Sequence, residues 1–225
     1  MKGKIAYRFE TPAYPGDILY VNMIANYACS CDCTFCGRPR DRKTSFGGTI
    51  YEKKAGTPLF LPKSPSVNEV MTAIDANVKD DDKELAIIGL GEPLIYLPKV
   101  LEVLKQVKEQ YGLNTRVDTN GLVRASNHNV VEQLSSAGLD QARISLNATN
   151  AEDYNSLCNP KVQDAFQYLV SFVRECERSD IETFVSFVTQ HPQSRPEQEY
   201  IEFAQSLGIP LERIILREYM DITNV

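Results

Sequence analysis

The stretch that decides the fold is residues 18–36, ILYVNMIANYACSCDCTFC. Residues 18–24 are almost wholly apolar, which predicts a buried strand. Four cysteines follow within residues 29–36. A small secreted domain spreads its disulfide cysteines along the chain, so this crowding at one loop indicates metal or redox chemistry at the end of the first buried strand.

Three of these cysteines, Cys29, Cys33 and Cys36, form a CxxxCxxC pattern. Cubane iron–sulfur clusters take thiolate ligands from tight, loop-borne spacings of this kind. Three protein ligands leave one iron open to bind a substrate or cofactor directly. A closed zinc site with Cys31 as the fourth ligand is the alternative, and the cysteines alone leave both open.

Outward from this loop, apolar strands alternate with amphipathic helices. The predicted strands are 18–24, 84–90, 114–119, 141–147, 181–189 and 213–219. The predicted helices are 66–78, 98–111, 129–137, 152–157, 163–178 and 196–207, with Ser66 as an N-cap and Gly112 as a helix end. The alternation predicts parallel strands joined by right-handed crossovers, in either an open doubly wound sheet or an incomplete (β/α) barrel.

Length and charge narrow the class of protein. We expect the 225 residues to form one α/β domain, with 1–17 as an N-terminal lead-in segment. The net charge of −6 argues against general nucleic-acid binding, which needs a basic surface. No apolar run approaches the ~20 residues of a membrane helix, and no secretory signal follows the basic N-terminus. These features predict a soluble, cytoplasmic protein.

Three further polar stretches fall at predicted strand ends, namely Gly89–Pro93, Asp118–Gly121 and Ser145–Asn147. Glycines let a ligand approach the backbone, and a carboxylate such as Glu92 accepts hydrogen bonds from an ammonium group. Each stretch also has an ordinary interpretation as a connector, a turn or a helix cap. Because the carboxyl ends of parallel strands carry the site in α/β folds, their joint placement favours function.

Taken together, these stretches resemble the radical S-adenosylmethionine (SAM) superfamily over almost the whole chain. Cys29, Cys33, Phe35 and Cys36 match its CxxxCxφC signature, in which φ is aromatic. Gly89–Pro93 resembles its GGEP stretch, with Leu90 in place of a glycine. The fold that the resemblance implies is a partial (β/α)₆ TIM-type barrel.

The resemblance also implies the site. Cys29, Cys33 and Cys36 would hold a [4Fe–4S] cluster, although the extra Cys31 puts this trio in question. Glu92 would take the methionyl ammonium of SAM, Thr119 and Ser145 would contact SAM, and Phe35 would pack near the adenine. The full set expected to bind the cofactor is Phe35, Gly89, Gly91, Glu92, Pro93, Asp118, Thr119, Asn120, Ser145 and Asn147.

The implied activity is reductive cleavage of SAM to a 5′-deoxyadenosyl radical that attacks an unidentified substrate. An external electron donor such as flavodoxin or ferredoxin would supply the electron. A closer resemblance, to the TatD-associated radical SAM proteins, is carried by Tyr7–Phe9, Asp17–Tyr20, Ile144–Ala148 and Tyr154–Pro160. It implies a TatD-type hydrolase as a partner. The alternative is a non-catalytic iron–sulfur or zinc protein on the same barrel.

Several residues outside the signature have two interpretations. Cys176 lies in a predicted amphipathic helix and is expected to pack in the core. Cys158 either packs in the same way or faces the site. His191 is either a proton donor or an ordinary loop residue. The basic residues after the cluster either bind an anion or lie in a solvated loop; they are Arg38, Arg40, Arg42 and Lys43.

Overall fold

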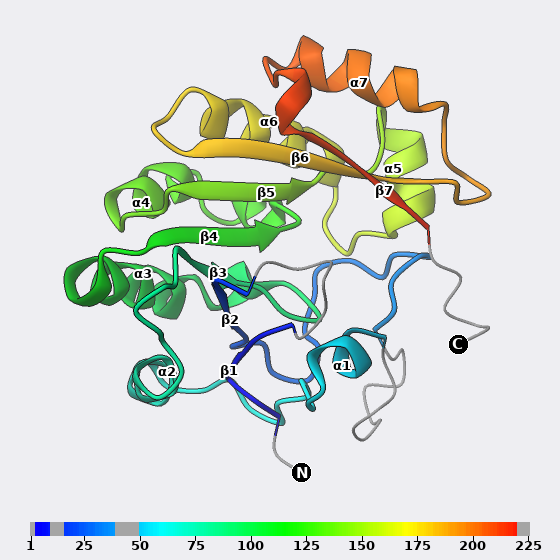
Figure 1. Cartoon of the computed structure of the whole chain (residues 1–225). Coiled ribbons are helices and arrows are strands. Elements are labelled where there is room, and N and C mark those ends of the chain that lie inside the picture. The colour runs from blue at the N-terminus through cyan, green and yellow to red at the C-terminus, as the bar shows by residue number, and fades with distance from the viewer. Residues whose placement is uncertain (1–2, 10–15, 39–49, 220–225) are drawn as a thin grey trace. The chain divides into compact units, whose positions relative to one another are not determined.

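The computed structural model describes residues 3–9, 16–38 and 50–219 (Figure 1). Arg40, Arg42 and Lys43 lie outside the described residues, so the predictions for them are not addressed by it. The chain divides into two compact units. The first contains residues 1–29, 37–117 and 137–139, and the second contains residues 30–36, 118–136 and 140–225.

The first unit is built on β1 (Ala6–Tyr7), β2 (Ile18–Val21), β3 (Glu84–Ile87) and the first residues of β4 (Asn114–Thr119). β1 pairs antiparallel with β2. β2 pairs parallel with β3, and β3 pairs parallel with β4. The predicted parallel pairing is therefore confirmed in this unit. The strand β1 was not predicted, because two residues are too few to show a period.

The helices of the first unit are α1 (Ile50–Ala55), α2 (Val67–Asp75) and α3 (Leu97–Tyr111), with a 3₁₀ turn η1 (Pro93–Tyr96) before α3. Ser66 caps α2 through a capping box with Glu69, as predicted. Gly112 ends α3 in the left-handed region, at φ 65°, also as predicted. These two caps fix where both helices begin and end.

The strand predicted over 18–24 ends at Val21, because Asn22 takes the chain out of the sheet. The Asn22 amide donates to the carbonyl of Leu59 at 2.7 Å, and its Oδ1 accepts from the backbone of Ile24 at 3.1 Å. Asn22 is 1 % exposed, so both hydrogen bonds are buried. An Asn side chain that bonds the backbone two residues on forms a local turn that competes with the strand ladder.

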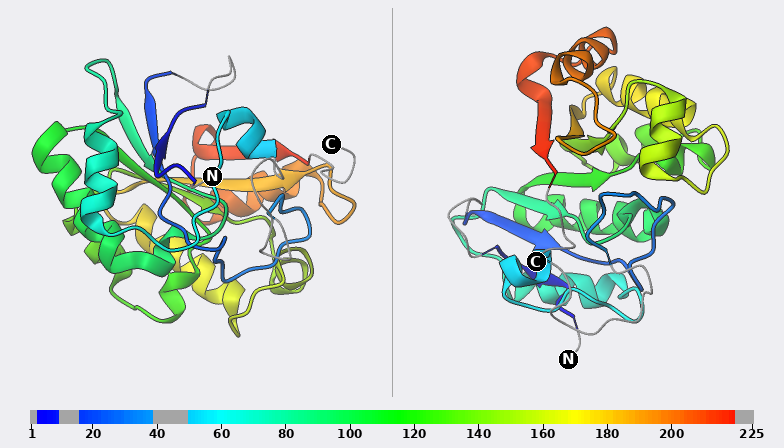
Figure 2. Two further views of the ribbon diagram at one scale, coloured as in Figure 1. Left: turned by 90° about the horizontal axis from the view of Figure 1, so that it is seen from below. Right: turned by 90° about the vertical axis from the view of Figure 1, so that its right-hand side faces the viewer.

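The second unit contains β5 (Gln141–Ser145), β6 (Glu182–Thr189) and β7 (Ile214–Glu218). β5 pairs parallel with β6, and β6 pairs parallel with β7. Its helices are α4 (Val130–Ser136), α5 (Ala151–Cys158), α6 (Ala165–Glu177) and α7 (Glu197–Ser206). Two 3₁₀ turns complete it, η2 (Leu122–Ala125) and η3 (Leu211–Arg213). In Figures 1 and 2, α7 lies alongside β6 and β7, which it contacts.

The buried stripe of α6 forms much of the core of the second unit, through Leu169, Phe172, Val173 and Cys176. Cys176 is 0 % exposed, so its predicted role in packing is confirmed. Gly121, at φ 70°, lies against this stripe, and a Cβ there would meet the Phe172 ring at 2.9 Å. The glycine of the Asp118–Gly121 turn is therefore required by packing as well as by backbone conformation.

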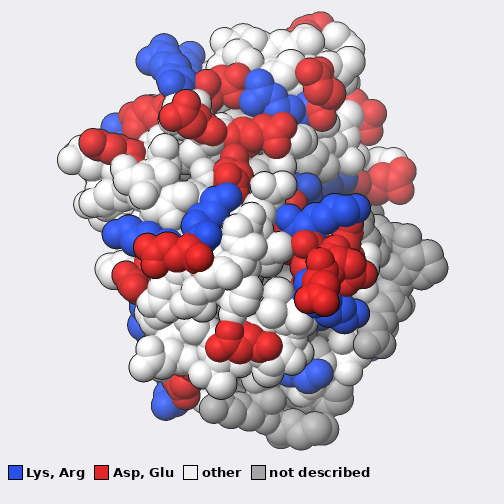
Figure 3. All heavy atoms as spheres, turned by 60° about the vertical axis from the view of Figure 1, so that its left-hand side comes forward, with Lys and Arg blue, Asp and Glu red and all other residues white. Residues whose placement is uncertain are grey.

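Acidic and basic side chains are interspersed on the face shown in Figure 3. Among the described residues, no helix is both long and apolar enough to cross a membrane.

Candidate functional site

The cysteine loop of the second unit, Ser30–Cys36, docks on the C-terminus of α5. The amide of Asp32 donates to the carbonyl of Cys158 at 3.1 Å, and the amide of Thr34 donates to that of Leu157 at 2.9 Å. The Thr34 hydroxyl donates to the same Leu157 carbonyl at 3.3 Å. The last carbonyls of a helix lack hydrogen-bond donors within the helix. The loop amides provide these donors, and the same hydrogen bonds fix the loop in place.

The CxxxCxxC cysteines and Cys31 differ in burial. Cys29, Cys33 and Cys36 are partly exposed, whereas Cys31 is 2 % exposed. The Cys31 sulfur lies 3.8 Å from the hydroxyl of Tyr154 and 3.7 Å from the amide of Asn120. Cys31 is thus held inside the second unit by side chains from two other elements.

The pKa of the Cys33 thiol is raised from its ordinary value by its surroundings, which include the thiols of Cys158 and Cys31. The hydrogen bond with Cys158 raises the pKa of Cys33, and burial adds to this, while the contact with Cys31 opposes it. Cys158 is 1 % exposed, as packing in the core also requires. The raised pKa favours the neutral thiol, and a bound metal ion would oppose this by stabilising the thiolate.

Across residues 3–9, 16–38 and 50–219, no three Cys, His, Asp or Glu side chains are gathered so as to hold one metal ion. A structural zinc site needs four ligands close around a single ion.

The Gly89–Pro93 loop of the first unit packs against the residue that precedes Cys29. The amide of Glu92 donates to the Ala28 carbonyl at 2.8 Å. Gly91 has a φ of 138°, and a Cβ there would stand 2.4 Å from the same carbonyl. A Cβ at Gly89 would stand 2.5 Å from the Asn22 Oδ1 atom. Both glycines are therefore needed for the backbone to approach this closely.

Glu92 is 3 % exposed and acts as the N-cap of η1, where its Oε1 accepts from the amide of Leu94 at 2.9 Å. Pro93 follows at the first position of that turn and is buried. Glu92 and Pro93 therefore connect the strand to the helix that follows, as the connector interpretation predicts. The carboxylate therefore fixes the start of η1.

At the end of β4, Thr119 and Asn120 form the turn that the Asn-Gly pair predicts. The Thr119 hydroxyl accepts from the amide of Gly121, and the Asn120 Oδ1 accepts from Leu122, both at 3.0 Å. The Asn120 amide also donates to the Ser30 hydroxyl at 2.9 Å. Asp118 precedes them and is partly buried. Asn120 therefore ties this strand end to the cysteine loop.

At the end of β5, Asn147 stands in the left-handed region with φ 58° and is 3 % exposed. Its amide lies 3.8 Å from the sulfur of Cys158. Its Oδ1 is buried and has no hydrogen-bond partner among the described residues. A buried acceptor without a partner costs about 1–3 kcal/mol, so this atom suits a ligand. Ser145, two residues earlier, pairs in register with Ser186 of β6.

The end of β6 carries a residue that the sequence analysis missed. Thr189 is 2 % exposed, and its hydroxyl has no hydrogen-bond partner among the described residues. The only signal in the sequence is a hydroxyl at the last position of β6, directly after the apolar pair Phe187 and Val188.

His191 follows Thr189 and contacts the cysteine loop, with its Nε2 lying 3.4 Å from the hydroxyl oxygen of Thr34. Its Nδ1 accepts from the amide of Gln193 at 3.2 Å, so the neutral ring carries its proton on Nε2 and donates to Thr34. Burial lowers the pKa of His191, which favours this neutral form. His191 thus links the loop after β6 to the cysteine loop.

Phe35 lies on the cysteine loop and is partly buried. Arg38 does not lie in a solvated loop. It is 6 % exposed and donates to the carbonyl of Tyr27 at 3.1 Å, within the first unit. The expectation of a solvated charged residue is therefore wrong at Arg38, because the backbone carbonyl and burial hold its guanidinium.

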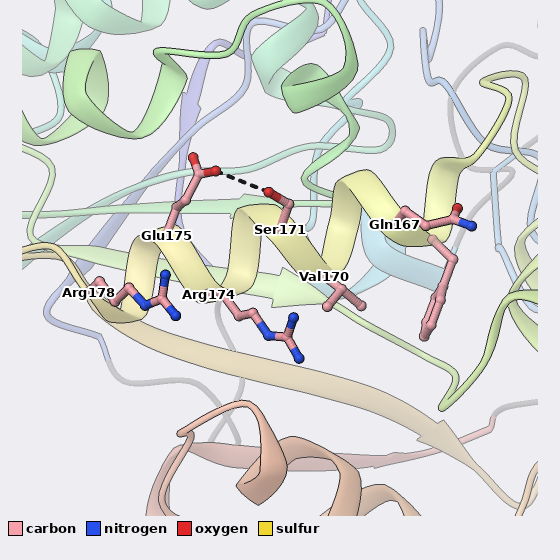
Figure 4. A pocket seen from close by; sticks show the side chains of 7 residues that line it. Gln167, Val170, Ser171, Arg174, Glu175 and Arg178 are labelled. Carbon is pink, nitrogen blue, oxygen red and sulfur yellow. Dashed lines mark hydrogen bonds between the residues drawn. The ribbon is translucent and has the colours of Figure 1, made fainter.

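A hollow of about 450 Å³ lies on the outer side of α6 (Figure 4). Arg174, Glu175 and Arg178 line it, and Glu175 accepts a hydrogen bond from Ser171 at 3.0 Å. None of the residues expected from the sequence to bind a cofactor lines this hollow. It is a feature of the helix surface and is separate from the strand ends.

The family model of the radical SAM superfamily matches residues 23–205, and the chain belongs to this superfamily. Members use a [4Fe–4S] cluster and SAM, and the chain is an enzyme of the radical SAM type. The residues present fit these cofactors. Partly exposed thiols lie on one short loop, and the buried Asn147 Oδ1 lacks a hydrogen-bond partner among the described residues.

Among curated proteins, the S-adenosyl-L-methionine-dependent tRNA 4-demethylwyosine synthases of Pyrococcus horikoshii and Pyrococcus abyssi are similar to this chain. They are 24% and 25% identical over 156 residues, which are 64% of this chain and 44% of each relative. The chain therefore spans less than half the length of these relatives.

Solved structures that are similar include TYW1 with a lysine-pyruvate adduct bound, with a TM-score of 0.59 at 16% identity over 91% of this chain and 65% of that one. The maturase HydG from Carboxydothermus hydrogenoformans has a TM-score of 0.65 at 13% identity, and the match covers 91% of this chain and 44% of HydG. Native anSMEcpe with bound AdoMet has a TM-score of 0.61 at 14% identity, and the match covers 90% of this chain and 52% of that one. These likenesses confirm the α/β partial barrel and decide against the open doubly wound sheet.

Proposed function

We propose that the chain holds its [4Fe–4S] cluster through Cys29, Cys33 and Cys36 and cleaves SAM to act on a substrate not yet identified. The main support for this proposal is the difference in burial among the cysteines of the loop. The three cysteines of the signature are partly exposed, whereas Cys31 is 2 % exposed between Tyr154 and Asn120. This supports three ligands rather than four, and hence one iron open to SAM.

For SAM, we propose Glu92 as the acceptor of the methionyl ammonium, because its carboxylate is buried in the loop after β3 and a carboxylate accepts hydrogen bonds from an ammonium group. The unpartnered Oδ1 of Asn147 is proposed as a second contact. The remaining proposed contacts lie at strand ends or on the cysteine loop and follow the family pattern; they are Phe35, Gly89, Gly91, Pro93, Asp118, Thr119, Asn120 and Ser145.

When bound, the cluster supplies the electron that cleaves SAM into methionine and a 5′-deoxyadenosyl radical. The protein's own contribution is to orient and to shield. The C-terminus of α5 fixes the cysteine loop through the amides of Asp32 and Thr34. Gly91 brings the backbone next to Ala28, the residue before the first ligand.

Residues 1–225 are proposed to act as one radical SAM core domain, with 1–17 as its lead-in. An external donor such as flavodoxin or ferredoxin is proposed to supply the electron. All six cysteines are thiols, which fits a reducing, cytoplasmic compartment. The curated relatives act on tRNA, but the net charge of −6 does not favour that substrate here.

We also propose that the chain belongs to the TatD-associated group and works with a TatD-type hydrolase. The support is the segment Tyr154–Pro160, on which that resemblance rests. Its residues dock the cysteine loop, since Leu157 and Cys158 accept the loop amides and Pro160 bridges Cys31. Copurification of the hydrolase with this chain tests the partnership, whereas substrate turnover by the isolated chain would count against it.

The experiment that tests the proposed function is anaerobic cluster reconstitution followed by EPR of the reduced protein with and without SAM. We expect a [4Fe–4S]⁺ signal that SAM perturbs, and formation of 5′-deoxyadenosine. Cys33→Ala should abolish both. Cys176→Ala is the matched control, because Cys176 is equally a thiol but is buried in the core of α6.

Two outcomes would overturn the proposal. Zinc bound by four thiolates would show a structural metal site, and a cluster indifferent to SAM would show a binding module without the cleavage activity. Retention of the full signal by Cys33→Ala would move the ligand set to include Cys31.

A further inference from the structure

The sheet of the second unit has two unlike faces. On β5 and β6, the apolar side chains of one face are at most 1 % exposed; they are Ala142, Ile144, Val185 and Phe187. Phe187 stacks on Tyr200 of α7, with the ring centroids 4.6 Å apart, so α7 packs against this face. Side chains alternate along a strand, so the residues between these four belong to the opposite face.

The opposite face is polar along three neighbouring strands. Ser145 of β5 pairs in register with Ser186 of β6, and Val188 of β6 pairs with Arg217 of β7. Arg143 lies on the same face, two residues before Ser145. Parallel strands are normally apolar on both faces, and branched apolar side chains dominate the interior of an α/β barrel. Polar side chains on this face therefore favour a ligand over internal packing.

Two arginines of the polar face, Arg143 and Arg217, differ in their contacts. Nε of Arg143 donates to Gln141 at 2.9 Å, and its guanidinium lies 5.7 Å from the centroid of the Phe184 ring. Arg217 is exposed, and its side chain has no hydrogen bond or ion pair with any described residue. At the carboxyl end of this face, the guanidinium of Arg217 is therefore available to a ligand.

The carboxyl end of β7 lies beside the cysteine loop. Tyr219 directly follows β7, two residues after Arg217, and its ring lies edge-on to the His191 ring with the centroids 4.7 Å apart. Nε2 of His191 lies 3.4 Å from the hydroxyl oxygen of Thr34, which is the neighbour of the proposed ligand Cys33. A molecule held by Arg217 would thus lie on the side of the sheet end where SAM is to be cleaved.

We infer that Arg217 binds an anionic group of the substrate, a carboxylate or a phosphate carried by a small molecule that lies on the polar face of β5, β6 and β7. This inference rests on the proposed function, which leaves the substrate unidentified. A guanidinium presents two parallel N–H donors that match two oxygens of such a group. One available cation suits a single anionic group, whereas a nucleic acid needs several basic residues along its backbone.

The alternative is that Arg217 is an ordinary solvated arginine, and Arg174 is the matched example of that case. Arg174 is also exposed, and its side chain also has no hydrogen bond or ion pair with any described residue. It lies on the outer side of α6 (Figure 4). The two arginines therefore have the same chemistry and differ in their distance from the strand ends.

The test uses the reconstituted full chain with SAM, a chemical reductant and a metabolite extract of bacteria grown in D₂O. An anion-exchange resin divides the extract into an anionic fraction and a flow-through. The 5′-deoxyadenosyl radical takes a deuterium atom from a bound molecule, so a C–D bond breaks there, one forms in 5′-deoxyadenosine, and the unpaired electron stays on the substrate carbon. Mass spectrometry measures the deuterium in 5′-deoxyadenosine and in recovered SAM.

We expect deuterium transfer from the anionic fraction and not from the flow-through. Arg217→Gln should reduce this transfer about tenfold at limiting extract, as for one lost charge-assisted hydrogen bond. Arg217→Lys should reduce it less, because lysine keeps the charge and loses only the two-point geometry. Arg174→Gln should transfer deuterium as wild type does. Calorimetry measures the affinity of every variant for SAM.

Deuterium transfer from the flow-through, or from neither fraction, would overturn the inference. Wild-type transfer by Arg217→Gln, or an equal loss in Arg174→Gln, would do the same. A loss of SAM affinity in Arg217→Gln that matches its loss of transfer would make Arg217 a contact of the cofactor and would also overturn it. A wild-type chain that forms no 5′-deoxyadenosine would instead refute the proposed function.

Discussion

The two ends of the strands are stabilised in opposite ways. At the amino ends, charged groups are paired. In the first unit Arg8 makes a two-point ion pair with Asp82, at 2.6 and 2.7 Å, and in the second Arg213 makes one with Glu177. At the carboxyl ends, the buried polar atoms Asn147 Oδ1 and Thr189 Oγ1 have no hydrogen-bond partners among the described residues.

This difference indicates that the amino ends of the strands serve stability and that the carboxyl ends serve ligand binding. In α/β barrels the carboxyl ends of the strands hold the active site, whereas the amino ends serve the fold. A closed ion pair has no capacity left for a ligand, whereas an unpartnered acceptor does. Substitutions at the amino ends should therefore change the free energy of unfolding alone, and those at the carboxyl ends should change cofactor binding.

The largest effect is expected at the carboxyl end of β3, from Gly91→Ala. The new Cβ would stand 2.4 Å from the Ala28 carbonyl at a φ of 138°, so the backbone must shift next to the first cluster ligand. We expect a loss of about 3 kcal/mol in unfolding free energy and loss of cluster assembly. Urea unfolding and iron content measure both.

The control for Gly91→Ala is Gly112→Ala, which has a φ of 65° but nothing within 4 Å of its Cβ. It should cost about 1 kcal/mol, from backbone conformation alone, and should keep the cluster. Equal behaviour of the two variants would remove the special role assigned to Gly91.

A smaller effect, confined to stability, is expected at the amino end of β3, from Asp82→Asn. It leaves the guanidinium of Arg8, 16% exposed, without its carboxylate. The expected loss is about 2 kcal/mol, with the SAM response of the cluster unchanged. Asp17→Asn breaks the exposed pair with Lys83 and should leave the free energy of unfolding unchanged, because water and salt screen an exposed pair.

The Asp82→Asn variant should also change how stability depends on pH. Burial raises the pKa of Asp82, but hydrogen bonds from Arg8 and the amide of Lys79 outweigh it, so its pKa lies below the ordinary value. The stability that it contributes is thus present above the unfolded pKa of about 3.9 and is lost as pH falls through the lower folded pKa. Asp82→Asn should flatten the acid limb of the stability profile, and an unchanged acid limb would contradict this.

A third substitution, Thr189→Val, tests the unpartnered hydroxyl at the carboxyl end of β6. Valine keeps the shape and removes a buried donor that has no hydrogen-bond partner among the described residues. We expect the unfolding free energy to stay equal or to rise by up to about 1 kcal/mol. SAM should bind about fivefold more weakly, as for one lost hydrogen bond. Calorimetry of SAM binding and thermal unfolding measure the two effects, and lower stability with unchanged binding would refute the assignment.

The sequence predicts the regular parts of this molecule well, because strands, helices and caps depend on neighbours within a few residues. Ser66 and Gly112 act as predicted. It predicts neither the end of β2 at Asn22 nor the hydrogen bond from Asp32 to the Cys158 carbonyl, since both depend on residues distant in the chain. Thr189 was missed for the same reason, because a lack of partners shows only in the folded chain.

The smallest effect is expected at His191, also at a carboxyl end. Burial lowers its pKa, so the unfolded chain binds more protons below pH ~6.5. The stability due to neutral His191 is therefore complete above that pH and is lost as pH falls through the lower folded pKa. Protonation removes the Nδ1 acceptor of the Gln193 amide, which should loosen the turn that positions the ring on Thr34.

His191→Gln keeps a side-chain N–H for Thr34 but does not titrate, so its unfolding free energy should vary less than that of wild type between pH 7 and pH 5. Thermal unfolding across that range measures the difference. Parallel profiles for the two proteins would show that the ring does not respond to pH through this contact. A steeper wild-type profile would place at the carboxyl ends a group that titrates between pH 7 and pH 5, above the acid range in which Asp82 titrates at the amino end of β3.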